Sequence, residues 1–479
     1  MAPELVITLV AVGIFVVMIL LEVPIGISIA LAGTVGILML NGGLVASQVA
    51  GTVPFSATAK YALVVIPMYI LLGTLISNAG IGTDIYRAVN RVARRLPGGL
   101  AATAVIATAL FSGISGSSAA DVATFGRISV NEMSRHGYDR AYAAAVVAAA
   151  GAFAALIPPS VTIVLYAIIA EQNVAAMILA AVIPGMISAV ALVIFVSLRA
   201  GFGGKQVGGK RDDRALAESL SLSLQEAKET GALLTKTATG GLVAPMTGTT
   251  SLPSGTLRRD LLSVLYAVII FGIVVGGLYG GVFTATESGA VGAFVALIIA
   301  MVARGSRQVS LGRMLKTSLQ ETANVTSMIF LLLIGGAIFA FFVASSGLAR
   351  DMTIWATGLA VDPIVVVILF LAVLLVLGAF LDGLSTMLVT VPLMAPVIDQ
   401  LGFSGVWFGI LVLKVIEIGL ITPPVGINTF IIAGLAKVPI LPVFKRLVPF
   451  VALDLVVTAI LLIFPDIILW LPRAAGMVP

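Results

Sequence analysis

Long apolar stretches alternate with short polar segments along almost the whole chain. An α-helix rises 1.5 Å per residue, so about 20 apolar residues cross the roughly 30 Å hydrocarbon core of a bilayer. The pattern therefore predicts an all-α polytopic membrane protein. The expected spans lie near residues 4–21, 25–41, 61–79, 141–170, 174–198, 260–281, 284–303, 322–346, 403–434 and 447–471.

Two further apolar regions, 99–133 and 362–400, are cut near their middles by small or polar residues. Each half has roughly 15 residues, too few to cross the membrane. We therefore expect re-entrant hairpins that enter and leave on one side. The alternative is a pair of ordinary spans that tolerate polar residues.

Adjacent prolines interrupt two of the spans, at Leu-Ile-Pro-Pro-Ser-Val-Thr (156–162) and Ile-Thr-Pro-Pro-Val-Gly-Ile-Asn (421–428). Proline has no amide hydrogen and clashes with the preceding helical turn, so each pair breaks its helix. In hydrocarbon such a break persists only where protein or a wet cavity satisfies the freed backbone groups. Broken helices in corresponding positions of two halves are typical of the binding site of a secondary transporter.

The positive charges support the hairpin interpretation. If the N-terminus is outside and each hairpin returns to its own side, 22 of the 27 lysine and arginine residues fall in inner segments, as the positive-inside rule requires. These segments are 82–98, 134–140, 199–259, 303–321 and 435–446. The rule fails if either hairpin becomes a single crossing. The first hairpin then opens to the cytoplasm and the second to the outside, which is an inverted arrangement.

The two halves also correspond in order. A polar, arginine-rich helix at 82–96 precedes the first hairpin, a shorter polar stretch at 347–360 precedes the second, and each hairpin is followed by a broken span. Inverted-topology repeats have this order. We expect the first repeat in 81–199 and the second in 347–446, with scaffold helices before each, in 1–80 and 258–346, and a last span in 447–479. Residues 200–257 are expected to form a cytoplasmic linker, which contains an amphipathic stretch that could be helical at 215–229.

Composition excludes several kinds of chemistry. The chain is 60% hydrophobic and only 10% charged, well below the quarter that is usual for a soluble domain. It has no cysteine and a single histidine, His136, so disulfides, thiolate sites and multi-histidine metal sites are excluded. Its formal charge of +5 reflects topology, because no basic cluster is interleaved with aromatic residues; nucleic acid is not an expected partner.

The first hairpin turns at Phe-Ser-Gly-Ile-Ser-Gly-Ser-Ser-Ala-Ala-Asp, 111–121. Its glycines allow a sharp turn, and Ser115, Ser117 and Ser118 supply hydroxyl oxygens. Hard cations prefer oxygen ligands, and half-helix N-termini favour anions. The alternative is a small-residue surface for helix packing.

The second hairpin turns near Gly-Ala-Phe-Leu-Asp-Gly-Leu-Ser-Thr, 378–386. An acid deep in an apolar region is a functional candidate, so Asp382 is expected to balance a cation, cap a half-helix, or do both. Lys414 and Glu417 are three residues apart and are expected to form an ion pair. Asn428 offers an amide after the second break.

A last acidic residue, Glu287, lies at a turn between two spans. We expect Thr284 or Thr286 to cap the helix there.

At these residues the chain resembles the large membrane subunit of TRAP transporters, of the DctM type. The matching stretches are Ile-Pro-Met-Tyr-Ile-Leu-Leu-Gly at 66–73, Ser-Gly-Ser-Ser-Ala-Ala at 115–120, Ile-Pro-Pro-Ser at 157–160, Phe-Thr-Ala-Thr-Glu at 283–287 and Glu-Ile-Gly-Leu-Ile-Thr-Pro-Pro-Val-Gly-Ile-Asn at 417–428. Together they cover nearly the whole chain. It departs from the family at Met68, often Phe, at Ala285, often Pro, and in the long 200–257 segment.

The resemblance implies an elevator-type, Na⁺-coupled importer of small organic acid anions in the bacterial inner membrane, with a periplasmic N-terminus and no cofactor besides Na⁺ as coupling ion. It implies two partners, a periplasmic substrate-binding protein and a separate small four-helix membrane subunit. The implied Na⁺ ligands are Ser115, Gly116, Ser117, Pro158 and Ser160 at the first break, and Asp382, Gly383, Thr386, Thr422, Pro424 and Gly426 at the second. The implied substrate contacts, between the two tips, are Ser117, Ser118, Ser160, Asp382 and Asn428.

Three other functions remain for comparison. A stand-alone sodium–dicarboxylate-type symporter could share this inverted-repeat fold. An intramembrane enzyme would have to use Asp382 and Glu417, which lie on different elements without a recognisable hydrolase motif. A pure scaffold would not need exposed carbonyls at mid-membrane. The chain is therefore not expected to be an enzyme.

Overall fold

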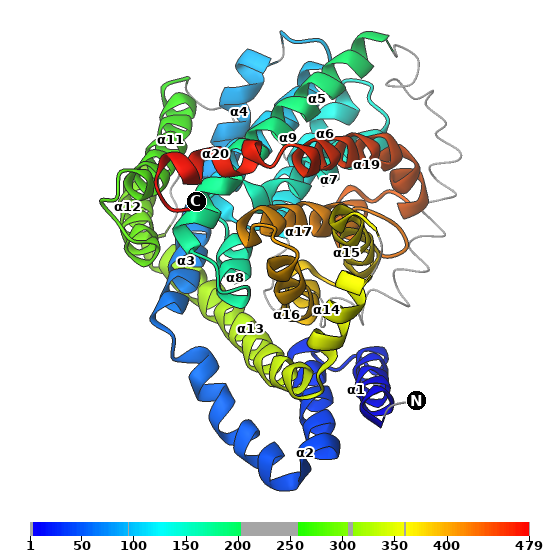
Figure 1. Cartoon of the computed structure of the whole chain (residues 1–479). Coiled ribbons are helices and arrows are strands. Elements are labelled where there is room, and N and C mark those ends of the chain that lie inside the picture. Colours follow the sequence, from blue (N-terminus) through cyan, green and yellow to red (C-terminus); the bar gives the residue numbers. More distant parts are fainter. Residues whose placement is uncertain (1–2, 94, 203–256, 305–309, 359–360, 479) are drawn as a thin grey trace.

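The computed structural model describes residues 3–93, 95–202, 257–304, 310–358 and 361–478, and these residues form helices joined by short turns (Figure 1). Seven of the described helices are long and apolar enough to cross a membrane. The expected helix at 215–229 lies outside the described residues. The scaffold helices are α1 (Pro3–Leu20), α2 (Ile25–Thr58), the 3₁₀ turn η1 (Tyr61–Val64), α3 (Val65–Asn78), α11 (Leu257–Tyr279), α12 (Ala285–Arg304) and α13 (Leu311–Ser345).

The first repeat has the order that the sequence predicts. Its hairpin, α5 and α6, consists of two helices of 17 and 18 residues that pack on each other, and neither is among the seven helices that are long and apolar enough to cross a membrane. The elements are α4 (Ile81–Ala93), α5 (Gly99–Ser115), α6 (Ser118–Arg135), α7 (Arg140–Ala152), η2 (Ala154–Leu156), α8 (Val161–Ile169) and α9 (Val174–Phe202). The helix is broken between η2 and α8, where Pro158-Pro159 lies, so this hairpin and this break are confirmed.

The second repeat follows the same plan. Its elements are α14 (Leu348–Gly358), the hairpin helices α15 (Pro363–Gly378) and α16 (Gly383–Gln400), and the broken pair α17 (Gly405–Gly419) and α18 (Ile427–Ala436). The chain then ends with α19 (Ile440–Ile463) and α20 (Asp466–Ala474). The predicted fold class, an all-α membrane protein with two hairpins and two broken helices, is confirmed.

Three predicted spans have different bounds in the structure. α2 continues past the predicted end at 41, through a kink at Gly42, because helical hydrogen bonding resumes even where the sequence turns polar. α13 already begins at Leu311, before its apolar stretch. The last span begins at Ile440 rather than 447, since Lys445 and Arg446 can extend toward water from a helix. It also ends at Ile463, and α20 packs on α9 as a separate short helix.

The two repeats interlock at their broken helices. α8, from the first repeat, packs on the hairpin helix α16 of the second, and α18 packs on α6 and α7 of the first. Tyr166 on α8 donates a hydrogen bond to the carbonyl oxygen of Gly405, with an oxygen–oxygen distance of 3.0 Å. Side chains of α7 from Ala141 to Ala152 and of α17 from Val406 to Gly419 are all buried, as in a helix surrounded by protein.

The scaffold is held by close backbone contact between α2 and α13. A Cβ atom on Gly335 would lie only 2.2 Å from the carbonyl oxygen of Gly26, and one on Gly33 would lie 2.9 Å from the Cα atom of Phe339. Glycines allow this approach, which maximises dispersion contact where helices gain little from leaving water. In Figure 1, α2 lies at the bottom of the molecule and α13 runs diagonally above it.

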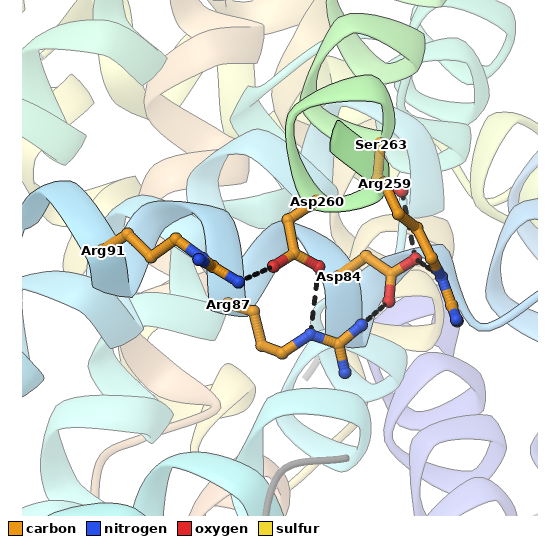
Figure 2. A network of polar contacts seen from close by, with 6 residues as sticks. All are labelled: Asp84, Arg87, Arg91, Arg259, Asp260 and Ser263. Atoms are coloured by element: carbon orange, nitrogen blue, oxygen red, sulfur yellow. Dashed lines mark hydrogen bonds and ion pairs between the residues drawn. The ribbon is translucent and has the colours of Figure 1, made fainter. Parts of the chain in front are cut away.

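A buried network of charges joins the arm helix α4 to the scaffold helix α11 (Figure 2). Asp260, with no exposed surface, accepts hydrogen bonds from Arg87 Nε at 3.0 Å and Arg91 Nη2 at 2.8 Å. Arg87 also pairs with Asp84, which in turn accepts from Arg259 and from the Ser263 hydroxyl. Because Arg87 touches both acids, the network ties the entry of the first repeat to the helix that follows the linker.

Replacing Asp260 by asparagine should destabilise the protein. The change leaves the buried Arg87 partly uncompensated, and breaking a buried ion pair typically costs about 3 kcal/mol or more. The expected result is a clearly lower thermal unfolding midpoint for D260N in detergent. The matched control is D466N, which removes the exposed partner of Arg473 and should leave the midpoint unchanged. Equal midpoints for D260N and the unchanged protein would show that the network contributes nothing to stability.

Candidate functional site

The tip of the first hairpin lies directly against the first break. α5 ends at Gly116, whose φ of 61° is the left-handed conformation that favours glycine. A Cβ atom on this glycine would lie 3.0 Å from the Pro159 carbonyl oxygen, and one on Gly113 would lie 3.3 Å from the Pro158 carbonyl oxygen. The carbonyl oxygens of the proline pair itself therefore face the hairpin tip.

Two serines begin the half-helices at this point. Ser117 is the N-cap of α6, and its hydroxyl accepts a hydrogen bond from the Ala120 amide at 3.4 Å. Ser160 is the N-cap of α8 but makes no such capping bond, and its fully buried hydroxyl has no hydrogen-bond partner within the described part of the chain. A buried hydroxyl without a partner is costly. Ser160 Oγ is thus a ready oxygen ligand beside the carbonyls of the proline pair.

The second hairpin tip meets the second break in the same way. The Ala379 carbonyl oxygen at the tip accepts hydrogen bonds from the amides of Val425 and Gly426, at 3.3 and 3.2 Å. Asp382 caps α16 by accepting from the Leu384 and Ser385 amides at 3.0 and 3.1 Å, and it also accepts the Ser385 hydroxyl. The predicted capping role of Asp382 is confirmed, and its role toward a cation stays a prediction.

Threonines supply further oxygens at the second tip. Thr386 and Thr422 donate their hydroxyl hydrogens to the carbonyls of Asp382 and Ile418, at 2.9 and 2.6 Å. Each hydroxyl oxygen keeps lone pairs for another partner. The buried Asn428 amide nitrogen has no hydrogen-bond partner among the described residues, which leaves it available to an acceptor such as a carboxylate oxygen.

The structure thus brings each tip together with its own break, as the sequence predicts. Among the candidate ligands, Ser117 and Pro424 are exposed. No group of three or more His, Cys, Asp or Glu side chains that could hold a metal occurs among the described residues. Hydroxyl and carbonyl oxygens fit a hard monovalent cation better than a transition metal.

One buried acid at the first tip escaped the sequence reasoning. Asp121, fully buried on α6, accepts hydrogen bonds from the hydroxyls of Ser112 and Ser115 on α5. It thereby fixes the side chain of one predicted Na⁺ ligand and fastens the two hairpin helices together. The available signal was an acid within an apolar hairpin, nine and six residues after two serines.

The predicted ion pair between Lys414 and Glu417 is wrong. Lys414 pairs instead with Asp454 on α19, at 2.5 Å. Since α17 is surrounded by protein, the Lys414 side chain contacts an acid on a neighbouring helix rather than one a turn along its own helix. The Oε2 atom of the buried Glu417 carboxyl group has no hydrogen-bond partner among the described residues.

α17 also contacts the tip of the second hairpin. Ile416 packs on the second hairpin, where a Cβ atom on Gly383 would lie 3.2 Å from its side chain.

Glu287 lies away from both tips, in the first turn of α12. It forms a capping box with Thr284, at 2.8 Å from the Thr284 amide and 2.9 Å from its hydroxyl, as the sequence predicts.

Two repeats that each contain a hairpin followed by a broken helix are the architecture of a secondary transporter, whose binding site lies at the interface between the repeats. The model of the family described as "Tripartite ATP-independent periplasmic transporter, DctM component" matches residues 12–467. The chain therefore belongs to the DctM family of TRAP transporter large permeases.

Named relatives agree over nearly the full length. The chain is 28% identical to the C4-dicarboxylate TRAP transporter large permease protein DctM of Pseudomonas aeruginosa, covering 94% of this chain and 95% of that protein. It is 26% identical to the sialic acid TRAP transporter large permease protein SiaM of Vibrio cholerae, with the same coverage. It is also 28% identical to the isethionate TRAP transporter permease protein DctMQ of Oleidesulfovibrio alaskensis. That alignment covers 95% of this chain but 65% of the longer relative.

A solved structure has the same fold. The Alcanivorax borkumensis YdaH transporter, described as having an unusual topology, superposes with a TM-score of 0.56 at 16% identity, over 88% of this chain and 90% of that one. At this identity the likeness concerns the fold alone.

Substituting Gly116 by alanine should abolish transport more readily than folding. The left-handed conformation costs an L-residue about 1–2 kcal/mol, and the added methyl group would press on the Pro159 carbonyl. The control is G402A, which has the same kind of conformation, with φ of 81°, but open space around it. Uptake per molecule of protein should fall strongly in G116A and little in G402A. Similar uptake by both variants would show that the tip tolerates displacement from the break.

Proposed function

We propose that the protein is the large permease of a Na⁺-coupled TRAP importer that takes up a small organic acid anion. The observation that carries this proposal is the contact of each hairpin tip with its own proline-broken helix, repeated in two inverted halves. Such contacts concentrate oxygen ligands and half-helix ends at mid-membrane without exposing them to lipid.

The first break supplies the oxygens of one Na⁺ site. Pro158 and Pro159 carbonyls face Gly113 and Gly116, and the orphaned Ser160 hydroxyl lies on the same turn. A cation there would satisfy the hydroxyl oxygen, which otherwise stays buried without a partner. We assign Ser115, Gly116 and Ser117 as the ligands from the hairpin side.

The second break supplies the other site. Asp382 contributes the only formal charge, Thr386 and Thr422 contribute lone pairs, and Gly383, Pro424 and Gly426 contribute backbone oxygens. Gly426, at φ of 58°, turns the chain sharply into α18.

The anion belongs between the two tips. The N-termini of α6 and α16 carry partial positive charge and amide donors, which favour a carboxylate. Ser118, Ser160 and Asn428 add neutral donors. Relatives are named for C4-dicarboxylate, sialic acid and isethionate, all of them acids, which supports an organic acid here.

The remaining parts of the system follow from family membership and charge. We propose a small four-helix membrane subunit as one partner, as membership of the DctM family implies. We further propose a periplasmic binding protein that delivers the anion, an inner-membrane location with the N-terminus outside, an elevator movement of the repeats, and no enzymatic activity.

Transport should require an inward Na⁺ gradient. The permease is reconstituted in vesicles with its small subunit and binding protein, and accumulation of the labelled anion is measured with and without Na⁺ outside. Accumulation should stop when an ionophore collapses the Na⁺ gradient, and persist when only the proton gradient is collapsed. Uptake that ignores the Na⁺ gradient would refute the coupling. Uptake without any binding protein would favour the stand-alone symporter.

Asp382 offers a test that separates charge from capping. Asparagine caps helices as well as aspartate, so D382N should fold normally yet lose the charge at the second ion site. A charge-assisted contact is worth about 1.5–3 kcal/mol, so the Na⁺ concentration for half-maximal uptake should rise at least about tenfold. The control is D362N, because Asp362 caps the other helix of the same hairpin, α15, far from the tip. An unchanged Na⁺ requirement in D382N would leave Asp382 as a cap alone.

Serine variants test the first site independently. Both S160A and S117A should weaken Na⁺-dependent uptake more than protein amount. S160A should have the larger effect, because its hydroxyl is buried and lacks another partner, whereas Ser117 is exposed. Wild-type Na⁺ dependence in both variants would remove them from the ligand set.

A further inference from the structure

A basic pocket lies away from the hairpin tips, where α7, α9 and α19 meet. It has a volume of about 490 Å³ and is lined by Asp139, Ala141, Arg199, Pro442, Lys445 and Arg446. All six residues belong to or adjoin segments that the charge distribution places on the cytoplasmic side. The pocket therefore lies at the level of the inner-leaflet headgroups.

Arg199 is held in this pocket by rings rather than by acids. Its guanidinium carbon lies 5.4 Å from the centre of the Tyr142 ring and 5.9 Å from those of Phe195 and Phe450. The rings hold the guanidinium by cation–π attraction but offer no conventional acceptor for its N–H groups. Its Nη1 atom is buried and has no hydrogen-bond partner in the described chain. The pocket thus presents an oriented cation with an unused donor.

The one acid in the pocket is already engaged. Asp139 accepts from the Ala141 amide at 3.3 Å, which caps α7, and from Arg446 Nε at 3.0 Å. Arg199, Lys445 and Arg446 therefore line the pocket together with a single carboxylate, so the net charge of the lining residues is +2. Such a site favours an anion with several oxygens, and arginine suits phosphate because its planar fork matches two of them.

The surroundings indicate a lipid rather than a soluble anion. On α19, Leu441 and Val448 stand on the same exposed face as Lys445, with 61% and 64% of their surface exposed. On α9, Leu198 next to Arg199 is 53% exposed. A headgroup in the pocket would therefore have apolar side chains beside it for the acyl chains to cover.

We propose that this pocket binds the phosphate headgroup of an anionic phospholipid from the cytoplasmic leaflet. Basic pockets between membrane helices on that side recognise such headgroups. The inference rests on the orientation of the chain and not on Na⁺ coupling. Its test measures binding without transport, so failure of one does not decide the other.

The full chain, purified in detergent, is titrated with phosphatidylglycerol or phosphatidylcholine, and bound lipid is counted by native mass spectrometry. Phosphatidylglycerol should bind and phosphatidylcholine should not. Each basic charge near a membrane surface is worth about a fivefold change in affinity, so K445Q should weaken phosphatidylglycerol binding by about fivefold and the R199Q/K445Q pair by more. Lys445 is exposed, so K445Q should fold even if R199Q does not.

The matched control is R313Q/K316Q, two exposed cations near the start of α13, in another of the expected inner segments. That variant should bind phosphatidylglycerol as the unchanged protein does. Undiminished binding in K445Q, equal loss in the control, or equal binding of phosphatidylcholine would overturn the proposal. Glycerol phosphate or inorganic phosphate that competes as strongly as the lipid would also overturn it, by showing a site for a soluble anion.

Discussion

The structure depends on satisfying backbone groups that two proline pairs release inside the membrane. Hydrocarbon provides no hydrogen bonds, so each break needs protein beside it. At the second break the Ala379 carbonyl accepts two amides, and at the first a glycine tip approaches the Pro159 carbonyl. The hairpins must be re-entrant because their tips have to reach these breaks at mid-membrane. Repeat order, glycine placement and oxygen-rich tips all follow from this one need.

Much of this architecture could be predicted from sequence because its causes are local or additive. Half-length apolar segments, proline pairs and the distribution of lysine and arginine each carry a fixed physical meaning, and together they gave both hairpins and both breaks. Span bounds were less certain where helices extend into polar sequence, as in α2 and α19. Hydrogen bonding along a helix continues whether or not its residues are apolar.

The site itself could be predicted only in part. The capping role of Asp382 could be predicted because its partners, the amides of Leu384 and Ser385, lie only two and three residues later in the chain. The partners of Lys414 and Asp121 could not be read in this way, since they depend on which helix packs alongside. Lys414 finds Asp454 forty residues away, and Asp121 finds two serines across the hairpin. Helix caps and proline breaks follow a fixed spacing along the chain, whereas contacts between helices that are distant in sequence do not.

The burial of α17 has a consequence for how the protein is made. A helix with a buried lysine in its interior, a glutamate in its last turn and buried residues on every side is poorly suited to resting alone in a bilayer, where a central lysine costs about 2.5–3.5 kcal/mol. Its counter-charge, Asp454, is synthesised forty residues later. During translation α17 is therefore expected to wait at the insertion machinery until α19 emerges, so that Lys414 and Asp454 enter the membrane as a neutral ion pair.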